Sequence, residues 1–275
     1  MGIFRIPFTN RRAIFGFLNA NDAAMHLGGI RFGTNLRADY FHRGKWQGYK
    51  DLGSGLVTNV GVLALANEAV TLASPSGARI NTLFLANQHF TGKGTTAAAA
   101  TDIKLETIST NGGETAVAGT QTLVSAANLQ KYRTVATVTY TGSEAVTEWG
   151  LHTSATRTAT TGTPFTDGSA TTGTVTATPL TASSSTVQGQ QQTIFENTGH
   201  ATPHWGLVIS NTTSIITVPA WYKVADGTAA GVDPDNGNAY TIRPVLWDRK
   251  VFSAINVVAT DSIQFSYSLT ISSGG

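Results

Sequence analysis

The sequence predicts a mainly β protein: an antiparallel sandwich or jelly-roll-like body with one helix at about 54–72, an extended N-terminal arm and a Thr-rich β insert. Residues 263–271 alternate large and small polar side chains without a break, as a strand with one buried face does. Further strand-like segments are separated by turns rich in Gly and Asn, which is typical of sandwiches. Charged residues make up only 12% of the chain, which suits a subunit that functions inside an assembly.

The C-terminal segment carries the strongest strand signal. A second strand at 249–258 precedes the alternating strand at 263–271, and residues 259–262 have the composition of a turn. We therefore expect a C-terminal hairpin that closes the β body. Phe265 should lie in its core and Gln264 on its solvent face.

Residues 1–50 form a basic and aromatic segment. They hold eight Arg or Lys against Asp22 and Asp39, so the rest of the chain is acidic, since the whole chain carries +2. This asymmetry favours contact with an acidic surface or nucleic acid. A solvated basic tail is the alternative, but the segment is too apolar for a disordered tail. We expect an extended arm that is ordered on a neighbouring subunit.

The arm supplies the expected assembly contacts, with aromatic anchors and Arg side chains that pair with acidic groups. Aromatic rings beside basic residues could also stack on single-stranded bases. We do not expect nucleic acid, because no β-barrel platform surrounds them. The expected assembly contacts are Phe4, Arg5, Phe8, Arg11, Arg12, Phe15, Phe17, Tyr40, Phe41 and Trp46.

The period changes after residue 54. Leu56, Val60, Leu63, Ala66 and Val70 are spaced as one stripe of a helix. The helix should begin at Ser54 as its N-cap and end before Pro75. Strand-like segments follow at 80–85, 102–108, 132–140 and 145–152.

An insert at 152–244 divides the body into 51–151 and 245–275. Nineteen of the 35 residues at 153–187 are Ser or Thr. Disorder is one interpretation, and exposed β-structure is the preferred one because Thr forms strands. Further strands are expected at 215–222 and 240–247. The Trp-Gly-Leu at 205–207 repeats the one at 149–151, which is weak evidence for a duplication.

No catalytic or metal-binding set stands out in the sequence. The chain has no Cys, and Pro203 between His200 and His204 argues against a helical metal pair. The polar run at 233–238 lacks the Glu of a calcium loop. Glu148 beside Trp149 could face a sugar in a depolymerase, but an isolated carboxylate does not make the pair that glycoside hydrolysis needs. We expect no cofactor.

Several segments resemble a group of tailed-bacteriophage structural proteins. They are Leu-Trp-Asp-Arg-Lys-Val-Phe-Ser-Ala-Ile-Asn-Val-Val at 246–258, Asp-Ser-Ile-Gln-Phe-Ser-Tyr-Ser-Leu-Thr at 261–270, and shorter runs at 51–58, 125–128 and 145–151. The resemblance covers about 51–151 and 246–275. Shorter members of the group lack the insert, so we expect it to be an appended unit.

The resemblance implies a non-enzymatic virion structural protein, made in the host cytoplasm. The first hypothesis is a capsid decoration or head-associated subunit, attached by its N-terminal arm to the major capsid protein or neighbouring virion subunits. A tail, collar or fibre component that binds the host surface is the alternative, and a glycan depolymerase is a remote one. We expect a homo-oligomer and, since no apolar run spans a membrane, no membrane partner.

Overall fold

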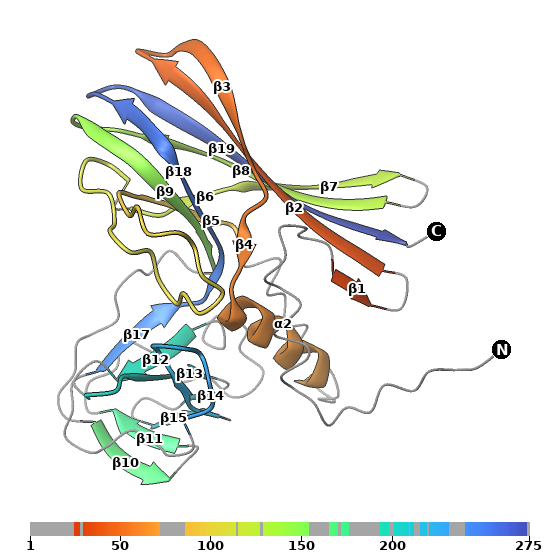
Figure 1. Cartoon of the computed structure of the whole chain (residues 1–275), viewed down its shortest axis with the longest axis vertical. Coiled ribbons are helices and arrows are strands. Elements are labelled where there is room, and N and C mark those ends of the chain that lie inside the picture. Colours follow the sequence, from red (N-terminus) through yellow and green to blue (C-terminus); the bar gives the residue numbers. More distant parts are fainter. Residues whose placement is uncertain are drawn as a thin grey trace.

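Two antiparallel sheets face each other and form a sandwich-like body (Figure 1). The computed structural model describes residues 25–27, 30–71, 86–113, 115–126, 129–153, 165–169, 172–175, 193–197, 201–208, 210–211, 215–218, 220–230 and 240–273. The chain is mainly β, as the sequence predicts, and α2 (Asn59–Thr71) is the one helix in this part of it.

The first sheet has six strands. They are β1 (Met25–Leu27), β2 (Ile30–His42), β3 (Lys45–Gly53), β7 (Thr120–Ala126), β8 (Leu129–Thr139) and β19 (Ser262–Ser273). Their order is β1-β2-β19-β8-β7, and β3 also pairs with β2. The predicted C-terminal strand, β19, is therefore central, with β2 and β8 on its two sides.

The second sheet of the body has five strands. They are β4 (Leu56–Val57), β18 (Leu246–Val257), β9 (Glu144–His152), β5 (Gln88–Gly92) and β6 (Val117–Ala118), in that order across the sheet. The strands expected at 132–140 and 145–152 correspond to β8 and β9.

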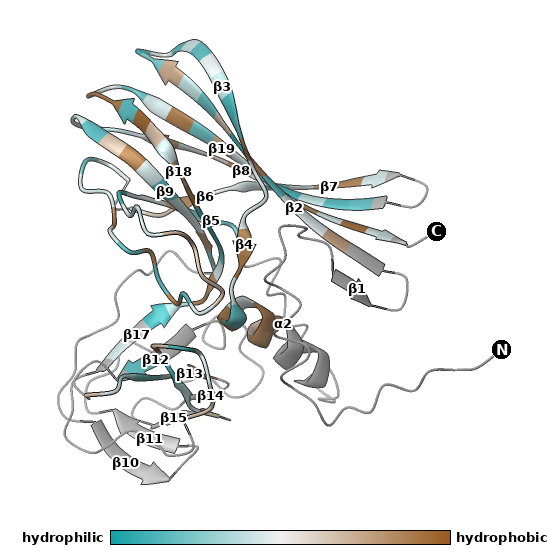
Figure 2. Cartoon of the chain, in the orientation of Figure 1, coloured by the Kyte–Doolittle hydropathy of each residue, from teal (hydrophilic) through white to brown (hydrophobic). Residues whose placement is uncertain are grey.

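The core lies between the two sheets. On β19, Phe265 and Tyr267 are buried on one face, while Gln264 on the other face is half-buried. The Trp149 ring on β9 stacks on Tyr267 at 5.5 Å and lies 6.3 Å from the Phe265 ring. Hydrophobic and hydrophilic residues alternate along these strands (Figure 2). The period-two pattern of the sequence thus reports the core face correctly, but Ser266 and Ser268 on the opposite face are buried as well.

The expected C-terminal hairpin is wrong. Strands β18 and β19 lie in opposite sheets and do not pair with each other. The corner between them is closed by the Asp261 amide, which donates to the Val258 carbonyl, and by the Val258 amide, which donates to the Asp261 carboxylate. Both edges of β19 are occupied by other strands, so no edge is open to β18. A turn signal between two strands does not decide whether the strands pair.

The expected boundary of the arm at residue 50 is also wrong. Strand β2 pairs with β19 over twelve residue pairs, from Ile30 with Ser273 to Phe41 with Ser262. Strand β3 pairs in turn with β2. Leu36 and Ala38 on β2 are fully or almost fully buried. The body therefore includes residues 30–53, and residues 1–24 lie outside the described part. The small size of Ala38 and the Arg and Asp beside it hide the alternation in the sequence.

Helix α2 begins later than expected. Thr58, not Ser54, is the residue that caps it: its hydroxyl accepts a hydrogen bond from the Gly61 amide at 3.1 Å. Ser54 instead donates to the Thr34 carbonyl, and Leu56 lies in β4. A Cβ at Gly61 would stand 2.9 Å from the Trp247 carbonyl oxygen. Glycine is required there because the helix packs closely on β18.

The insert contains β-structure, as the sequence predicts, in two four-stranded sheets. One consists of β16 (Tyr222–Lys223), β13 (His204–Val208), β12 (Thr193–Asn197) and β17 (Tyr240–Pro244). The other consists of β10 (Phe165–Ser169), β11 (Thr172–Val175), β15 (Ile215–Thr217) and β14 (Ser210–Asn211). Of the two predicted insert strands, 240–247 is divided between β17 and β18, and 215–222 between β15 and β16.

The insert shares a hydrophobic core with the body. Trp205 and Leu207 of β13 belong to the same buried cluster as Phe90, Leu105 and Leu246 of the body. At the rim of this contact, buried Glu196 of β12 accepts from Arg243 at 2.6 Å and from Lys104 at 3.5 Å. The insert is therefore packed into the body, and not appended to it as expected. Its shared residues are distant in sequence, so the linear pattern gives no sign of them.

Candidate assembly surface

The hairpin of β2 and β3 carries the candidate assembly surface. Its two-residue turn, Arg43-Gly44, has positive φ at both positions, 48° and 75°. This is the geometry of the turn type that best matches the twist of paired strands. The register places Phe41 opposite Trp46, and Asp39 opposite Tyr49. Because paired residues share a face, the turn brings separated aromatic and charged side chains onto one outer surface.

The two large rings on this surface are held in place while remaining open to solvent. Trp46 is 56% exposed and Tyr49 is 61% exposed. The Trp46 indole donates to an Asp39 carboxylate oxygen at 3.2 Å. The Arg37 guanidinium lies 4.1 Å from the centre of the Tyr49 ring, a cation–π contact. Exposed rings that are already fixed lose little side-chain entropy on binding a partner.

Asp39 connects these groups. It accepts two hydrogen bonds from Arg37, at 2.9 and 2.6 Å, in addition to the one from Trp46. The hydrogen bond from Arg37, and then that from Trp46, hold the pKa of Asp39 below its ordinary value against the opposing effect of burial. The carboxylate is thus ionised at neutral pH, and its oxygens are bound by Arg37 and Trp46 of the same surface. We name Arg37, Asp39, Phe41, Trp46 and Tyr49 the hairpin patch.

The inner side of the hairpin is fixed to Asp261 in the corner between β18 and β19. Tyr40 donates to the Asp261 carboxylate at 2.6 Å, and His42 Nδ1 lies 2.7 Å from the other oxygen of this group. The hydrogen bond to Asp261, with burial, raises the pKa of Tyr40 to about 12. The hairpin is therefore a rigid projection of the body.

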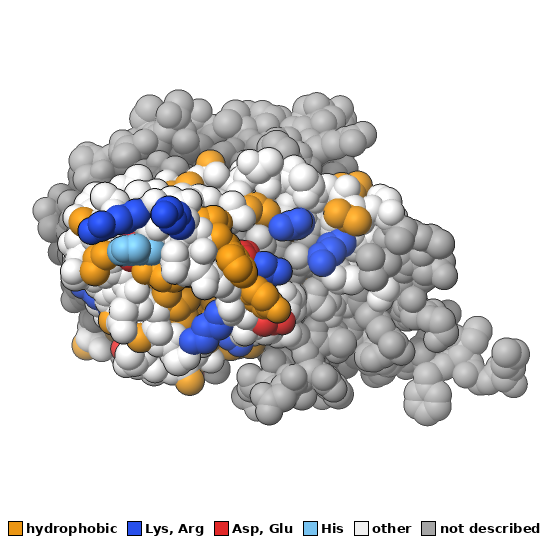
Figure 3. Space-filling model, turned by 90° about the horizontal axis from the view of Figure 1, so that it is seen from above, with side chains coloured by type: hydrophobic (Ala, Val, Ile, Leu, Met, Phe, Trp, Pro, Cys, Tyr) orange, Lys and Arg blue, Asp and Glu red, His pale blue; other side chains and the backbone are white. Residues whose placement is uncertain are grey.

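Positive charge lies at the turn of the hairpin, where Arg43 and Lys45 are exposed. Lys50 lies on the inner face opposite Ala38 and donates to the Ser253 carbonyl at 3.0 Å, while the exposed Asp51 lies opposite Arg37 on the face of the hairpin patch. Figure 3 shows Lys, Arg and hydrophobic side chains interspersed over this end of the molecule, with little Asp or Glu among them. The surface is suited to a partner that is apolar at its centre and acidic around it.

The structure places three of the ten predicted assembly contacts. Trp46 is exposed on the hairpin patch, Phe41 is half-buried beside it, and the Tyr40 hydroxyl is engaged by Asp261. The other seven lie outside the described residues: Phe4, Arg5, Phe8, Arg11, Arg12, Phe15 and Phe17. The ten predicted contacts do not include Arg37, Asp39 or Tyr49. An Arg-Gly turn between two aromatic segments is the signal that could have found them.

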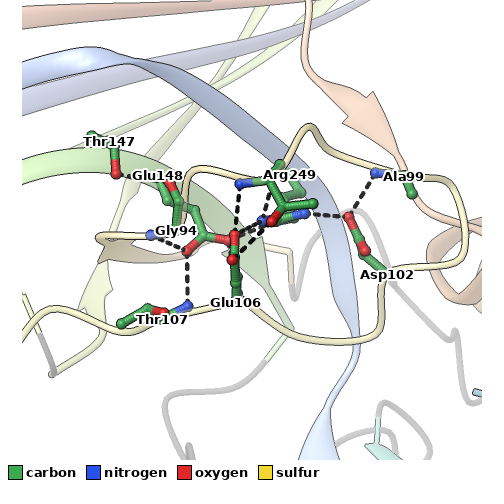
Figure 4. A network of polar contacts seen from close by, with 9 residues as sticks. Gly94, Ala99, Asp102, Glu106, Thr107, Thr147, Glu148 and Arg249 are labelled. Carbon is green, nitrogen blue, oxygen red and sulfur yellow. Dashed lines mark hydrogen bonds and ion pairs between the residues drawn. The ribbon is translucent and has the colours of Figure 1, made fainter.

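Glu148, which the sequence offered only as a remote candidate for a sugar contact, lies in a buried charge network (Figure 4). Its carboxylate has no exposed surface and is 2.6 Å from Arg249 Nε. It also accepts from the backbone amides of Gly94, Glu106 and Thr107 at 2.8–3.3 Å. A carboxylate enclosed in this way has no surface for a glycan, so its position favours the structural interpretation.

Arg249 holds the rest of this network. Its guanidinium contacts Asp102 at 2.6 Å and Glu106 at 3.5 Å. Burial alone would lower the pKa of Arg249, but Asp102 and Glu148 raise it above its ordinary value. The strand expected at 102–108 is instead a loop bound to this network, although Ile103 and Leu105 are buried as predicted strand residues would be. Two of its amides bind Glu148, and not a neighbouring strand.

The described part of the chain has no group of three or more His, Asp or Glu side chains that could hold a metal ion. His204 is buried in β13, while His200 and the run at 233–238 lie outside the described residues. Within the same described segments, none of the helices has the length and apolar character needed to cross a membrane. Comparison with models of known protein families, with curated proteins and with solved structures finds no match to this chain.

Proposed function

We propose that this chain is a non-enzymatic structural subunit of a tailed-bacteriophage virion, and within the virion a capsid decoration or head-associated protein. The two longest segments that resemble phage structural proteins occupy β18 and β19, and the run at 145–151 lies in β9, so these strands lie on both sides of the main core. The proposal therefore concerns the body of the protein and not an exposed tag.

The hairpin patch carries this proposal. Its two exposed rings are braced by Asp39 and Arg37 and project from a hairpin fixed at Asp261. A large aromatic surface held rigid in solvent is characteristic of interaction sites, where Trp, Tyr and Arg contribute most of the binding energy. The partner is the major capsid protein or a neighbouring virion subunit with an acidic, partly apolar surface.

The attachment site is thus the hairpin and not only the N-terminal arm. Exposed cations such as Arg43 and Lys45 would steer association. The rings of Trp46 and Tyr49, buried by the partner on binding, would hold the complex. Added salt should slow association but remove bound protein only weakly, because ion pairs at the rim contribute little.

Binding to particles that lack this subunit tests the proposal. The wild-type protein should bind saturably, and Trp46→Ala and Tyr49→Ala should each weaken binding by about fivefold or more, since truncating a central anchor costs roughly 1–4 kcal/mol. Gln47→Ala, an exposed change on the same strand, is the matched control and should bind as the wild type does. Equal binding by all four proteins would contradict the assignment of the hairpin patch.

The number of copies in each purified virion distinguishes the two structural hypotheses. Hundreds of copies would support the head shell. A few copies would support a tail, collar or fibre component that binds the host surface. Absence from the virion would reject both.

A further inference from the structure

The two edges of the six-stranded sheet differ in how readily they could pair with a strand of another chain. On one edge, β3 has two register shifts against β2 and contains Gly48 with φ of 146°. Lys45 and Lys50 also lie on this strand. Irregular pairing and edge lysines are features that prevent an edge strand from pairing with another chain.

The other edge has none of these features. β7 reads Thr-Gln-Thr-Leu-Val-Ser-Ala, without charge, Pro or Gly. Its pairing with β8 is regular over all seven residues, from Thr120 with Val135 to Ala126 with Leu129. Among the described residues, no strand pairs with its outer side. Figure 1 shows β7 at the border of the sheet, where the β7–β8 hairpin projects from the body.

Both faces of β7 are open and apolar at its middle. Leu123 is 71% exposed and Val124 is 48% exposed. Successive residues of a strand point to opposite faces, so solvent reaches the sheet from both sides here. A regular, uncharged edge strand with exposed apolar side chains is an association site.

A row of cross-strand neighbours reaches this edge from the core. Thr34 pairs with Leu269, Leu269 with Tyr132, and Tyr132 with Leu123. Thr34 and Leu269 are buried, Tyr132 is half-buried and Leu123 is open. The core face of the sheet therefore continues to the edge and stops at an uncovered Leu.

We infer that β7 pairs antiparallel with β7 of a second copy of this chain, about a two-fold axis close to Leu123. The two sheets then form one continuous sheet, and the exposed Leu123 side chains cover each other. The proposal does not depend on the hairpin patch or on a virion role.

The absence of charge on β7 favours a second copy as the partner. In a two-fold contact each residue meets a residue of the same strand, so any charge near the axis would meet its own kind. Like charges directly opposite each other on paired strands are destabilising. β7 avoids this conflict along its whole length, while the β3 edge, with two lysines, does not.

Sedimentation of the full-length protein over a wide concentration range tests the pairing. The wild type should shift with concentration from one chain of 28.8 kDa toward twice that mass. Leu123→Lys and Leu123→Glu should each remain monomeric, because like charges would meet at the axis. An equimolar mixture of the two variants should form a mixed dimer, because opposite charges then meet.

Two controls accompany these variants. Gln47→Lys adds the same charge to the opposite edge and should leave the dimer intact. Leu123 is exposed, so its variants should fold, and should melt as the wild type does at concentrations where the wild type is a monomer. A wild type that stays monomeric at all concentrations overturns the proposal, as does a dimer that survives Leu123→Lys. Failure of the mixture to associate also overturns it, since β7 would then contact a different surface.

Discussion

Replacing Arg249 with Met should destabilise the protein, because it leaves the buried carboxylate of Glu148 without its cation. Arg249 is the buried cation of the network in Figure 4, and Glu148 beside it has no exposed surface. Removing one member of a buried ion pair typically costs about 3–5 kcal/mol. Glu148 keeps three backbone amides as donors, and Met fills most of the volume of the Arg stem. The cost should therefore lie at the lower end, at about 3 kcal/mol.

A double-mutant cycle separates the ion pair from general disruption. Glu148→Gln removes the buried charge and retains an oxygen that accepts from the loop amides. When combined with Arg249→Met, it should recover part of the loss, with a coupling energy of about 0.5–3 kcal/mol. Urea unfolding followed by Trp fluorescence measures each free energy, since Trp149 is adjacent to Glu148 in the core. Hydrogen exchange at the Glu106 and Thr107 amides should quicken in both single variants.

Lys104→Met is the matched control, because it removes a cation from the more exposed pair with Glu196. The Lys104 side chain is 48% exposed and 3.5 Å from its partner, so the loss should be below about 1 kcal/mol. Two outcomes would contradict the reasoning: a loss for Arg249→Met as small as that of this control, or additive losses for the changes at 148 and 249. Either would mean that the ion pair of Arg249 and Glu148 does not stabilise the loop at 93–113.

Three further predictions concern the core, the response to pH and the insert. Phe265→Ala should cost about 3–5 kcal/mol in urea unfolding, whereas Gln264→Ala on the opposite face should cost less than about 0.5 kcal/mol; similar losses would mean that both faces are core. Burial raises the pKa of Asp248 to about 7, while its unfolded pKa is about 4, so its contribution to stability is present below about pH 4 and is lost as the pH rises to about 7. Asp248→Asn removes this pH dependence, so the variant should be more stable than the wild type at about pH 8, by up to about 4 kcal/mol, and similar to it at about pH 4. A variant that is less stable at both pH values would contradict the raised pKa of Asp248. Trp205→Ala should cost about 3–5 kcal/mol and lower the melting temperature of the body together with that of the insert; two separate transitions, with the body unchanged, would show an independent insert.

The sequence determined the elements whose signal is local. Strict alternation located β19 and its buried face, and a similar pattern located β8 and β9. The helical stripe located α2 to within a few residues, although the cap was Thr58 and not Ser54. The Thr-rich insert was correctly expected to contain strands. Each of these depends on the spacing of side chains along one segment, which is visible in the sequence.

The candidate site was only partly predictable. Trp46 was expected as a contact because it is a large aromatic residue in a basic segment, and it is exposed. Arg37, Asp39 and Tyr49 were not among the predicted contacts, because their role depends on the register of two strands, which brings Asp39 opposite Tyr49. A shift of one residue would have placed them on different faces.

Tertiary structure alone decided which segments are partners. The sequence showed β18 and β19 with a turn between them, but their separate sheets follow from the strands that occupy both edges of β19. The segment at 102–108 alternates as a strand does, yet its amides bind the carboxylate of Glu148. Arg249 and Glu148 meet across 101 positions of the chain. Local periodicity reflects the geometry of one segment, whereas pairing and burial of charge depend on atoms that only folding brings together.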